Sequence, residues 1–341
     1  MNPSNSAEKK IIFVYTGFSS FVKNDYDILQ SAHLVKKYHF SPVKGVAKNV
    51  LEIFRQLLFL LKNGRKTDLF YIWFADYHTF LPVLFAKILG KKSIVVIGGY
   101  DVCRIRKLNY GAFCSSFRGW FCAGSMRRAS LLLTVSGQVD RKTKVIAPLT
   151  PRRLMYNCVS PGIANSIDLH KTDAILTVGL IDNERTFYLK GIDTYLEVAR
   201  LLPSYRFDIV GIDSSRLSKL LEDIPGNVHL SGRVKQEELV DFYSRSRIYC
   251  QLSRSESFGV SIAEAMTFGN FPIVTNEGGM PEIVGSAGTV VHRSPKEIAD
   301  LITNVLQNKK EIDRSGIRRR VAENFSKEQR EELLLQTIRA H

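Results

Sequence analysis

The segment IYCQLSRSESFGVSIAEAM, residues 248–266, places an apolar run, a polar loop and a helical pattern one after another. The run Ile248–Leu252 is short and apolar, as in a buried strand, and a helix begins near Val260. A strand that leads through a loop into a helix is half of a βαβ unit. The segment therefore predicts a parallel sheet covered by helices.

The same alternation of strands and helices runs along the whole chain and divides it into two halves. Turn residues without a clear period fill 159–173, which we expect to link two domains. The fold class that follows is α/β, with two doubly wound, Rossmann-like domains that face each other across a cleft. We expect an N-terminal domain over 1–165, a C-terminal domain over 166–325, and a C-terminal helix over 326–341 that packs back on the N-terminal domain.

The predicted elements follow directly from the apolar periodicity. The strands are 11–15, 69–73, 93–97, 131–135, 174–178, 207–210, 228–230, 248–252, 272–275 and 289–291. The helices are 25–38, 50–62, 78–89, 110–128, 192–202, 216–221, 236–244, 260–268, 295–307, 310–324 and 326–340.

Composition excludes several classes of protein. The chain of 341 residues is 45% hydrophobic and 24% charged, so it is neither disordered nor fibrous. Apolar runs such as Leu57–Leu61 are far shorter than the roughly 18 to 20 residues that cross a bilayer. The polar segment Met1–Lys10 lacks the features of a signal peptide, and we expect a cytoplasmic protein. The five cysteines form no C-x-x-C pair, and we expect them to be reduced.

Positive charge is concentrated in the first half of the chain. Residues 1–165 hold 25 Lys plus Arg against 8 Asp plus Glu, which is +17, whereas 166–341 holds 23 against 25, which is −2. Such a field attracts anionic lipid head groups, nucleic acid or a phosphate-bearing substrate; the alternative is a basic surface that serves solubility. We predict no nucleic-acid partner, because an arginine-rich recognition helix and an aromatic-basic stacking pattern are both missing. The anionic inner face of a membrane is a candidate partner.

One helix of this basic half has an apolar stripe. Phe54, Leu58 and Leu61 lie at helical spacing within 50–62, and cations follow at Lys62, Arg65 and Lys66. We interpret the stripe as facing the core, as most such stripes do. The alternative is that it dips into a membrane interface.

The loop that precedes the helix of the opening segment has the features of an anion site. Ser257, Phe258 and Gly259 lie where free backbone N–H groups meet the positive end of the helix dipole. Glu256 and Glu264 flank this position, and ionised carboxylates can bind paired hydroxyls bidentately. The pattern favours a ligand with a central phosphate and hydroxyl-rich rings at both ends, a nucleotide sugar. The alternative is a capped surface helix with two solvated glutamates.

Three other loops follow strands of the same half. Lys190-Gly191 places a cation near the phosphates, and Asn276–Glu282 gives a glycine pair before a helix start. A strand ends in a glycine turn at Gly232, where a flat base could lie against the main chain. Because ligands of such sheets bind beyond the carboxyl ends of the strands, these loops converge on one site and support the nucleotide-sugar interpretation.

These motifs resemble those of the retaining glycosyltransferases of family 4, which have the GT-B fold. The resemblance is specific over 174–292 and weak before it. The matching stretches are Leu176–Gly179, Lys190–Asp193, Asn227–Gly232, the E-x7-E pattern from Glu256 to Glu264, and Glu277–Glu282.

The resemblance implies a role for each matching stretch. Glu264 would hold the ribose hydroxyls of the donor and Glu256 the transferred sugar. Lys190 and the amides of 257–260 would hold the diphosphate, and residues 232–235 the base. The implied donor-binding residues are Arg185, Lys190, Gly232, Val234, Lys235, Glu256, Ser257, Phe258, Gly259, Val260 and Glu264.

The implied mechanism retains the anomeric configuration, because the diphosphate leaves on the face from which the acceptor hydroxyl arrives. Lys190, a second cation and the helix end at Val260 would neutralise the charge that develops on the diphosphate. No metal and no cofactor beyond the donor substrate is implied, and the sequence has no H-E-x-x-H pattern.

Two positions depart from the family pattern. Leu180 follows the strand glycine where the family usually has Arg, and Arg185 is the candidate replacement. The family's His on an N-terminal loop has no clear match, so Asp76 or His78 could serve, or neither. Gly98–Asp101 follows a strand and should face the cleft; the alternative is an ordinary glycine turn. The catalytic candidates are Glu256, Lys190, Asp101 and Asp76, and the acceptor-side candidates are Gly17, Phe18, Gly98, Gly99 and His78.

We therefore expect a metal-independent, retaining hexosyltransferase of polysaccharide biosynthesis. It would move a sugar from a nucleoside-diphosphate sugar to a glycan or a lipid-linked glycan. The alternative, motivated by the missing His and Arg matches, is a catalytically silent nucleotide-sugar-binding subunit of a glycan-synthesis complex. A nicotinamide dehydrogenase is disfavoured, because no G-x-G-x-x-G follows a predicted strand.

Overall fold

The computed structural model describes residues 8–41, 46–159 and 171–341. The chain forms two compact units, one from 1–158 with 327–341 and the other from 159–326. The domain boundary expected between residues 165 and 166 lies outside the described residues. The second crossing between the units falls after Ser326, so the last helix belongs to the first unit.

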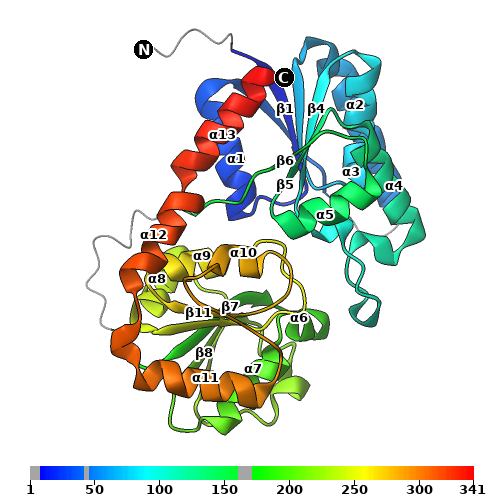
Figure 1. Ribbon diagram of the computed structural model, residues 1–341. Coiled ribbons are helices and arrows are strands. Elements are labelled where there is room, and N and C mark those ends of the chain that lie inside the picture. The colour runs from blue at the N-terminus through cyan, green and yellow to red at the C-terminus, as the bar shows by residue number, and fades with distance from the viewer. Residues whose placement is uncertain (1–7, 42–45, 160–170) are drawn as a thin grey trace, which may run out of the picture. The chain divides into compact units, whose positions relative to one another are not determined.

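The first unit is built on a parallel sheet with strand order β2-β1-β3-β4-β5-β6 (Figure 1). Its inner strands are buried on both faces, which explains why β3 is a continuous apolar run without alternation. The strands are β1 (Lys10–Tyr15), β2 (Leu34–His39), β3 (Leu69–Trp73), β4 (Lys92–Ile97), β5 (Leu131–Thr134) and β6 (Arg152–Leu154).

Helices cover both faces of this sheet. On one face α1 packs against α13, and on the other α3 lies between α2 and α4 (Figure 1). The helices are α1 (Ser20–Ala32), α2 (Val46–Asn63), α3 (Tyr77–Ile88), α4 (Ser116–Arg128), α5 (Gly137–Ile146) and α13 (Lys327–Ala340), with 3₁₀ turns at Gly64–Lys66, Tyr100–Val102, Arg106–Leu108 and Ala112–Cys114.

A buried ion pair fastens α13 to α1. The guanidinium of Arg330 donates to both carboxylate oxygens of Asp25, at 2.5 and 2.7 Å, and the Tyr71 hydroxyl donates to the same carboxylate at 2.6 Å. Arg330 also donates to the carbonyls of Met155 and Tyr156, just before the chain leaves the unit. Four of the five donors of this guanidinium are therefore used inside the protein, which offsets the cost of burying its charge.

The second unit repeats the architecture with strand order β12-β11-β10-β7-β8-β9, again entirely parallel. α7 and α11 pack together on one face, and α9 packs against α10 and α12 on the other. The strands are β7 (Ile175–Ile181), β8 (Phe207–Ile212), β9 (Val228–Ser231), β10 (Ile248–Gln251), β11 (Phe271–Thr275) and β12 (Thr289–Val291). The helices are α6 (Glu184–Leu189), α7 (Ile192–Leu201), α8 (Gln236–Arg245), α9 (Val260–Thr267), α10 (Met280–Val284), α11 (Pro295–Gln307) and α12 (Arg314–Asn324), with 3₁₀ turns at Ser218–Leu221 and Lys309–Glu311.

Two sequence-based expectations are wrong in the first unit. The helix predicted over 25–38 ends at Ala32, where the His33 N–H caps the Leu29 carbonyl, and Leu34–His39 is an edge strand paired with β1. An edge strand is half solvated, so its polar residues hid the strand pattern. The stripe of Phe54, Leu58 and Leu61 on α2 does not face the core, because all three side chains are exposed.

No helix within the described residues is both long enough and apolar enough to cross a membrane.

Candidate functional site

The start of α9 depends on a glycine. Gly259 has φ +97°, and a Cβ there would lie 2.6 Å from Cδ1 of Ile262. Only glycine adopts this turn without strain, and the turn brings the chain from β10 into the helix. Phe258 anchors the turn from below, because its side chain is buried edge-to-face against Phe325. Its contribution to a ligand site is therefore limited to its backbone.

Lys190 and Glu256 form an ion pair at the carboxyl ends of the strands of the second unit. Lys190 Nζ lies 2.6 Å from Glu256 Oε2, and both side chains keep partial exposure, 24% and 18%. Neither side chain is fully buried. A diphosphate could therefore attract Lys190 while a sugar hydroxyl replaces it at the carboxylate.

Lys190 is held in place by the loop after β10. Gly191 has φ +71°, and a Cβ there would lie 2.0 Å from the Leu252 carbonyl oxygen. The Arg254 amide donates to the Leu189 carbonyl at 2.8 Å, and its guanidinium forms an ion pair with Asp193 at 2.5 Å. The lysine loop and the glutamate loop are thus one packed structure.

A third loop closes on Glu256 from the other side. Gly278 has φ +68°, and a Cβ there would lie 1.5 Å from the Glu256 carbonyl oxygen. The N–H of Gly279 donates to that same oxygen at 3.0 Å. The glycine pair between β11 and α10 therefore fixes the backbone position of the glutamate.

Glu264 lies one turn into α9 and is held by the protein. The Tyr243 hydroxyl donates to Glu264 Oε2 at 2.9 Å. Burial raises the pKa of Glu264, while the hydrogen bonds from Tyr243 and Gln236 oppose that shift. The carboxylate is positioned by α8 before any ligand arrives.

The remaining predicted donor residues lie at the carboxyl ends of β9 and β7. Gly232 and Lys235 are exposed and Val234 is half-buried. The Gly232 carbonyl accepts from Gly211 N–H at 3.1 Å, and no atom lies within 4 Å of a Cβ built at Gly232. This leaves open space beside the backbone there. Arg185 is exposed on α6.

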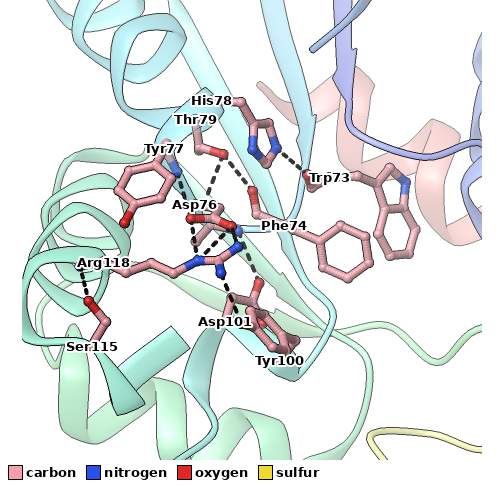
Figure 2. Close-up of polar contacts among 11 residues, drawn as sticks. Trp73, Phe74, Asp76, Tyr77, His78, Thr79, Tyr100, Asp101, Ser115 and Arg118 are labelled. Carbon is pink, nitrogen blue, oxygen red and sulfur yellow. Dashed lines mark hydrogen bonds and ion pairs between the residues drawn. The ribbon is translucent and has the colours of Figure 1, made fainter. Parts of the chain in front are cut away.

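Asp76 of the first unit serves a structural role. Its carboxylate caps α3 in a capping box with Thr79 and receives a bidentate ion pair from Arg118 of α4. Figure 2 shows Arg118 extended across to Asp76, with its other end 2.9 Å from the Tyr100 hydroxyl. This carboxylate is engaged by its own helix and the next one.

We expected His78 on the acceptor side of the site, but its side chain points into the first unit. The ring is buried, with Nε2 at 2.8 Å from the Trp73 carbonyl (Figure 2). Burial lowers the pKa of His78, so the neutral ring is favoured. The side chain is a packing residue of the first unit.

Asp101 is also turned inward, contrary to the expectation that it faces the cleft. Its carboxylate accepts from the N–H groups of Ala75 at 3.0 Å, Gly98 at 3.3 Å and Gly99 at 2.7 Å. Burial raises the pKa of Asp101 to about 6. The group ties the loop after β4 to the loop after β3.

The glycines of this edge make room for an aromatic side chain. A Cβ at Gly98 would lie 2.1 Å from the Phe74 ring, and Phe74 itself has φ +67°, which is rare for a bulky residue. Gly99 has φ +108°. Gly17 and Phe18 after β1 are exposed. Their part in acceptor binding stays a prediction.

Three residues that matter to these sites were missed from the sequence. Tyr243 holds Glu264, Arg254 holds Asp193, and Arg118 occupies Asp76. Only Arg254 carried a signal, since it lies in the loop of the opening segment. Among the residues the structure describes, no group of three or more His, Cys, Asp or Glu could hold a metal ion.

The comparison with protein families bears on the second unit. Residues 178–327 match the model of the family described as glycosyl transferases group 1. Over this stretch the chain is similar to the group 1 glycosyltransferases. The match agrees with the resemblance to glycosyltransferases drawn from the E-x7-E and glycine motifs, and retention of configuration stays a prediction.

Curated relatives are glycosyltransferases as well. The gpi3 subunit of phosphatidylinositol N-acetylglucosaminyltransferase from Schizosaccharomyces pombe is 27% identical over 271 residues, 68% of this chain and 58% of the relative. The O-antigen chain mannosyltransferase B of Escherichia coli is 29% identical over 126 residues, 36% of this chain and 32% of the relative. The chain thus spans little more than half the length of the gpi3 subunit and about a third of the length of the mannosyltransferase.

Solved structures share the fold over nearly the whole chain. Sucrose-phosphate synthase from Thermosynechococcus elongatus has a TM-score of 0.79 at 15% identity and covers 98% of this chain and 99% of that one. Anabaena HepE in complex with UDP-glucose has a TM-score of 0.72 at 15% identity and covers 98% and 100%. The α/β fold with two Rossmann-like units of the GT-B type is confirmed.

Proposed function

We propose that this protein is a cytoplasmic glycosyltransferase that takes a sugar from a nucleoside-diphosphate sugar and adds it to a glycan or lipid-linked glycan with retention of configuration. One observation carries the proposal. Lys190 and Glu256 pair at the carboxyl edge of one sheet, where their loops pack onto each other's backbones, and Glu264 lies one turn into α9, where Tyr243 holds it. This gives a cation for a diphosphate between two carboxylates for hydroxyl-bearing rings.

Each group has a separate part in the proposed transfer. Lys190 and the N–H groups at the start of α9 stabilise the negative charge that grows on the departing diphosphate. Glu264 binds the ribose, and Glu256 binds and orients the transferred sugar. The acceptor hydroxyl then attacks from the face that the diphosphate leaves. The proposed transfer uses no metal ion.

Ligand-induced stabilisation tests the donor site. UDP, GDP, ADP and dTDP with their sugar conjugates are added to the wild type in the presence of a chelator, and the shift in melting temperature is measured. At 100 times its dissociation constant a ligand adds about 2.7 kcal/mol to the unfolding free energy, which is easily seen. We expect one nucleotide to shift the wild type.

Matched variants locate the binding. Glu264→Ala and Lys190→Ala should lose most of the shift, whereas Glu222→Ala, which removes an exposed glutamate of the same unit, should keep it. Absence of a shift with every nucleotide, or a full shift in Glu264→Ala, would contradict the donor site.

A silent subunit is the second candidate function. The observation behind it is that Leu180 is exposed where the family usually has Arg, and that His78 is buried. Such a subunit would bind the donor without releasing sugar. Mass spectrometry of the donor after incubation separates the two, and Glu256→Gln should lower turnover more than nucleotide affinity only if the protein is an enzyme.

A further inference from the structure

Helix α2 buries two polar side chains beside Leu60 and exposes several apolar ones. Gln56 is fully buried and Glu52 nearly so, whereas Phe54, 53% exposed, faces outward with Leu58 and Leu61. The Gln56 amide donates to the His78 carbonyl at 2.8 Å, which fixes this orientation. The apolar stripe of α2 therefore points away from the sheet it covers.

The exposed apolar surface continues onto α4. α3 packs between α2 and α4 and exposes Ile88 at its end, while α4 exposes Phe117 and Trp120. The Trp120 ring is supported from beneath by Phe80 and Phe121, with centroids 5.6 and 5.0 Å away. We call the exposed side chains of this layer the α2–α4 face: Val50, Leu51, Phe54, Leu58, Leu61, Ile88, Phe117 and Trp120.

The exposed charges along the α2–α4 stretch are mostly positive. Four acidic residues occur from Val46 to Arg128, and only Asp68 is exposed. Glu52 is paired with Arg55, Asp76 with Arg118, and Asp101 is buried. The exposed cations of the same stretch, apart from Arg55, include Lys62, Arg65, Lys66, Lys87, Arg127 and Arg128.

We propose that the α2–α4 face docks on an anionic lipid bilayer. Its apolar side chains enter the boundary between head groups and acyl chains, and the surrounding cations contact the head groups. Trp120 has the amphipathic ring that sits at this depth. A protein partner is less favoured, because an uncompensated cationic rim next to a broad apolar surface matches an anionic bilayer in both respects. The proposal concerns where the protein works and stands apart from the donor site.

The two tryptophans make the test direct. Trp73 is fully buried, whereas Trp120 is 60% exposed, so a change in emission on vesicle binding reports Trp120. The full chain is mixed with phosphatidylcholine vesicles or with vesicles that also contain phosphatidylglycerol, and sedimentation measures the bound fraction. We expect binding to the anionic vesicles, a blue shift of emission, and quenching by brominated acyl chains.

Substitutions separate docking from simple charge attraction. Phe54→Ser with Leu58→Ser should lower the vesicle partition coefficient about tenfold or more, because buried apolar area contributes to interfacial binding. Leu201→Ser with Val290→Ser, two exposed apolar residues of the other unit, should leave it unchanged. Circular dichroism checks that both double variants are folded.

Three outcomes would overturn the proposal. They are no binding to anionic vesicles, binding without quenching of Trp120 by brominated lipid, and binding that salt abolishes but the Phe54 and Leu58 changes do not alter. A concentration-dependent dimer that the same changes dissolve would assign the face to a second copy instead. A loss of nucleotide binding bears on the donor site and leaves this test untouched.

Discussion

The carboxyl edges of the two parallel sheets carry similar side chains that do different work. In the second unit Lys190 and Glu256 face each other with partial exposure, and glycine turns hold their backbones. In the first unit the carboxylates of Asp76 and Asp101 are occupied by an arginine and by backbone N–H groups. Position at the edge of a parallel sheet is therefore not enough for function. What differs is what holds the carboxylate: Asp76 caps α3 and also pairs with Arg118, whereas Glu256 pairs with the flexible side chain of Lys190.

The largest expected effect comes from the glycine that supports Glu256. Gly278→Ala should lower the unfolding free energy of the second unit by more than about 3 kcal/mol, because the new Cβ meets a carbonyl oxygen at a strained φ. Denaturant unfolding followed by circular dichroism measures the loss.

A matched glycine provides the control. Gly226→Ala, where no atom lies within 4 Å of the new Cβ, should change the unfolding free energy by less than about 0.5 kcal/mol. Equal stability of the two variants would contradict the packed arrangement of the loops around Glu256.

Removing the carboxylate of Asp76 should have the next largest effect. Asp76→Ala removes a helix cap and leaves Arg118 without its anion, so we expect a loss of about 2 kcal/mol in the first unit. Tryptophan fluorescence during unfolding reports this unit, because Trp73 and Trp120 both lie in it.

The nucleotide affinity of the same variant sharpens the comparison. It should equal that of the wild type, since Asp76 is engaged in structure. Asp27→Ala, which breaks an exposed ion pair with Lys23, should cost less than about 0.5 kcal/mol. A fall in transfer without a fall in stability would return Asp76 to the catalytic candidates.

The smallest effect is a pH dependence that Asp101 gives to the first unit. The pKa of Asp101 is raised to about 6 in the folded protein from 3.8, so the folded state holds the proton more tightly. Its contribution to stability is complete below pH 4 and is lost as the pH rises through about 6, so the unfolding free energy falls by at most about 1.4 kcal/mol per pH unit over this range.

Unfolding free energies across this pH range measure the slope. The part due to Asp101 should vanish in Asp101→Asn and persist in Asp68→Asn, which changes an exposed carboxylate. An identical slope in Asp101→Asn and the wild type would show that another group is responsible.

The second unit could be predicted from sequence in most details. Its strands are apolar runs with turn residues at their ends, and the predicted 289–291 and 295–307 match β12 and α11. The site motifs were visible because glycine and charged residues lie close together in sequence there. The role of Tyr243 was not visible in the sequence, because its hydrogen bond to Glu264 joins two helices and spans 21 positions.

The first unit was harder to predict for physical reasons. The edge strand β2 has polar residues that imitate a helix, and α2 buries Glu52 and Gln56 beside Leu60 while it exposes Phe54, Leu58 and Leu61. Helical periodicity shows which side chains share one side of a helix but does not show whether that side faces the core or the solvent. Asp76 and Asp101 looked like free carboxylates because their partners, Arg118 and the amide of Ala75, lie far away in sequence.

The ion pair of Arg330 with Asp25 sets an order in which the protein can be completed during synthesis. Asp25 and Tyr71 emerge from the ribosome long before Arg330, because all of the second unit is translated between them. Until then the Asp25 carboxylate lacks its cation, and α1 lacks the helix that packs on it. The second unit, although later in the chain, can therefore reach its final form while the first one still waits for its last helix.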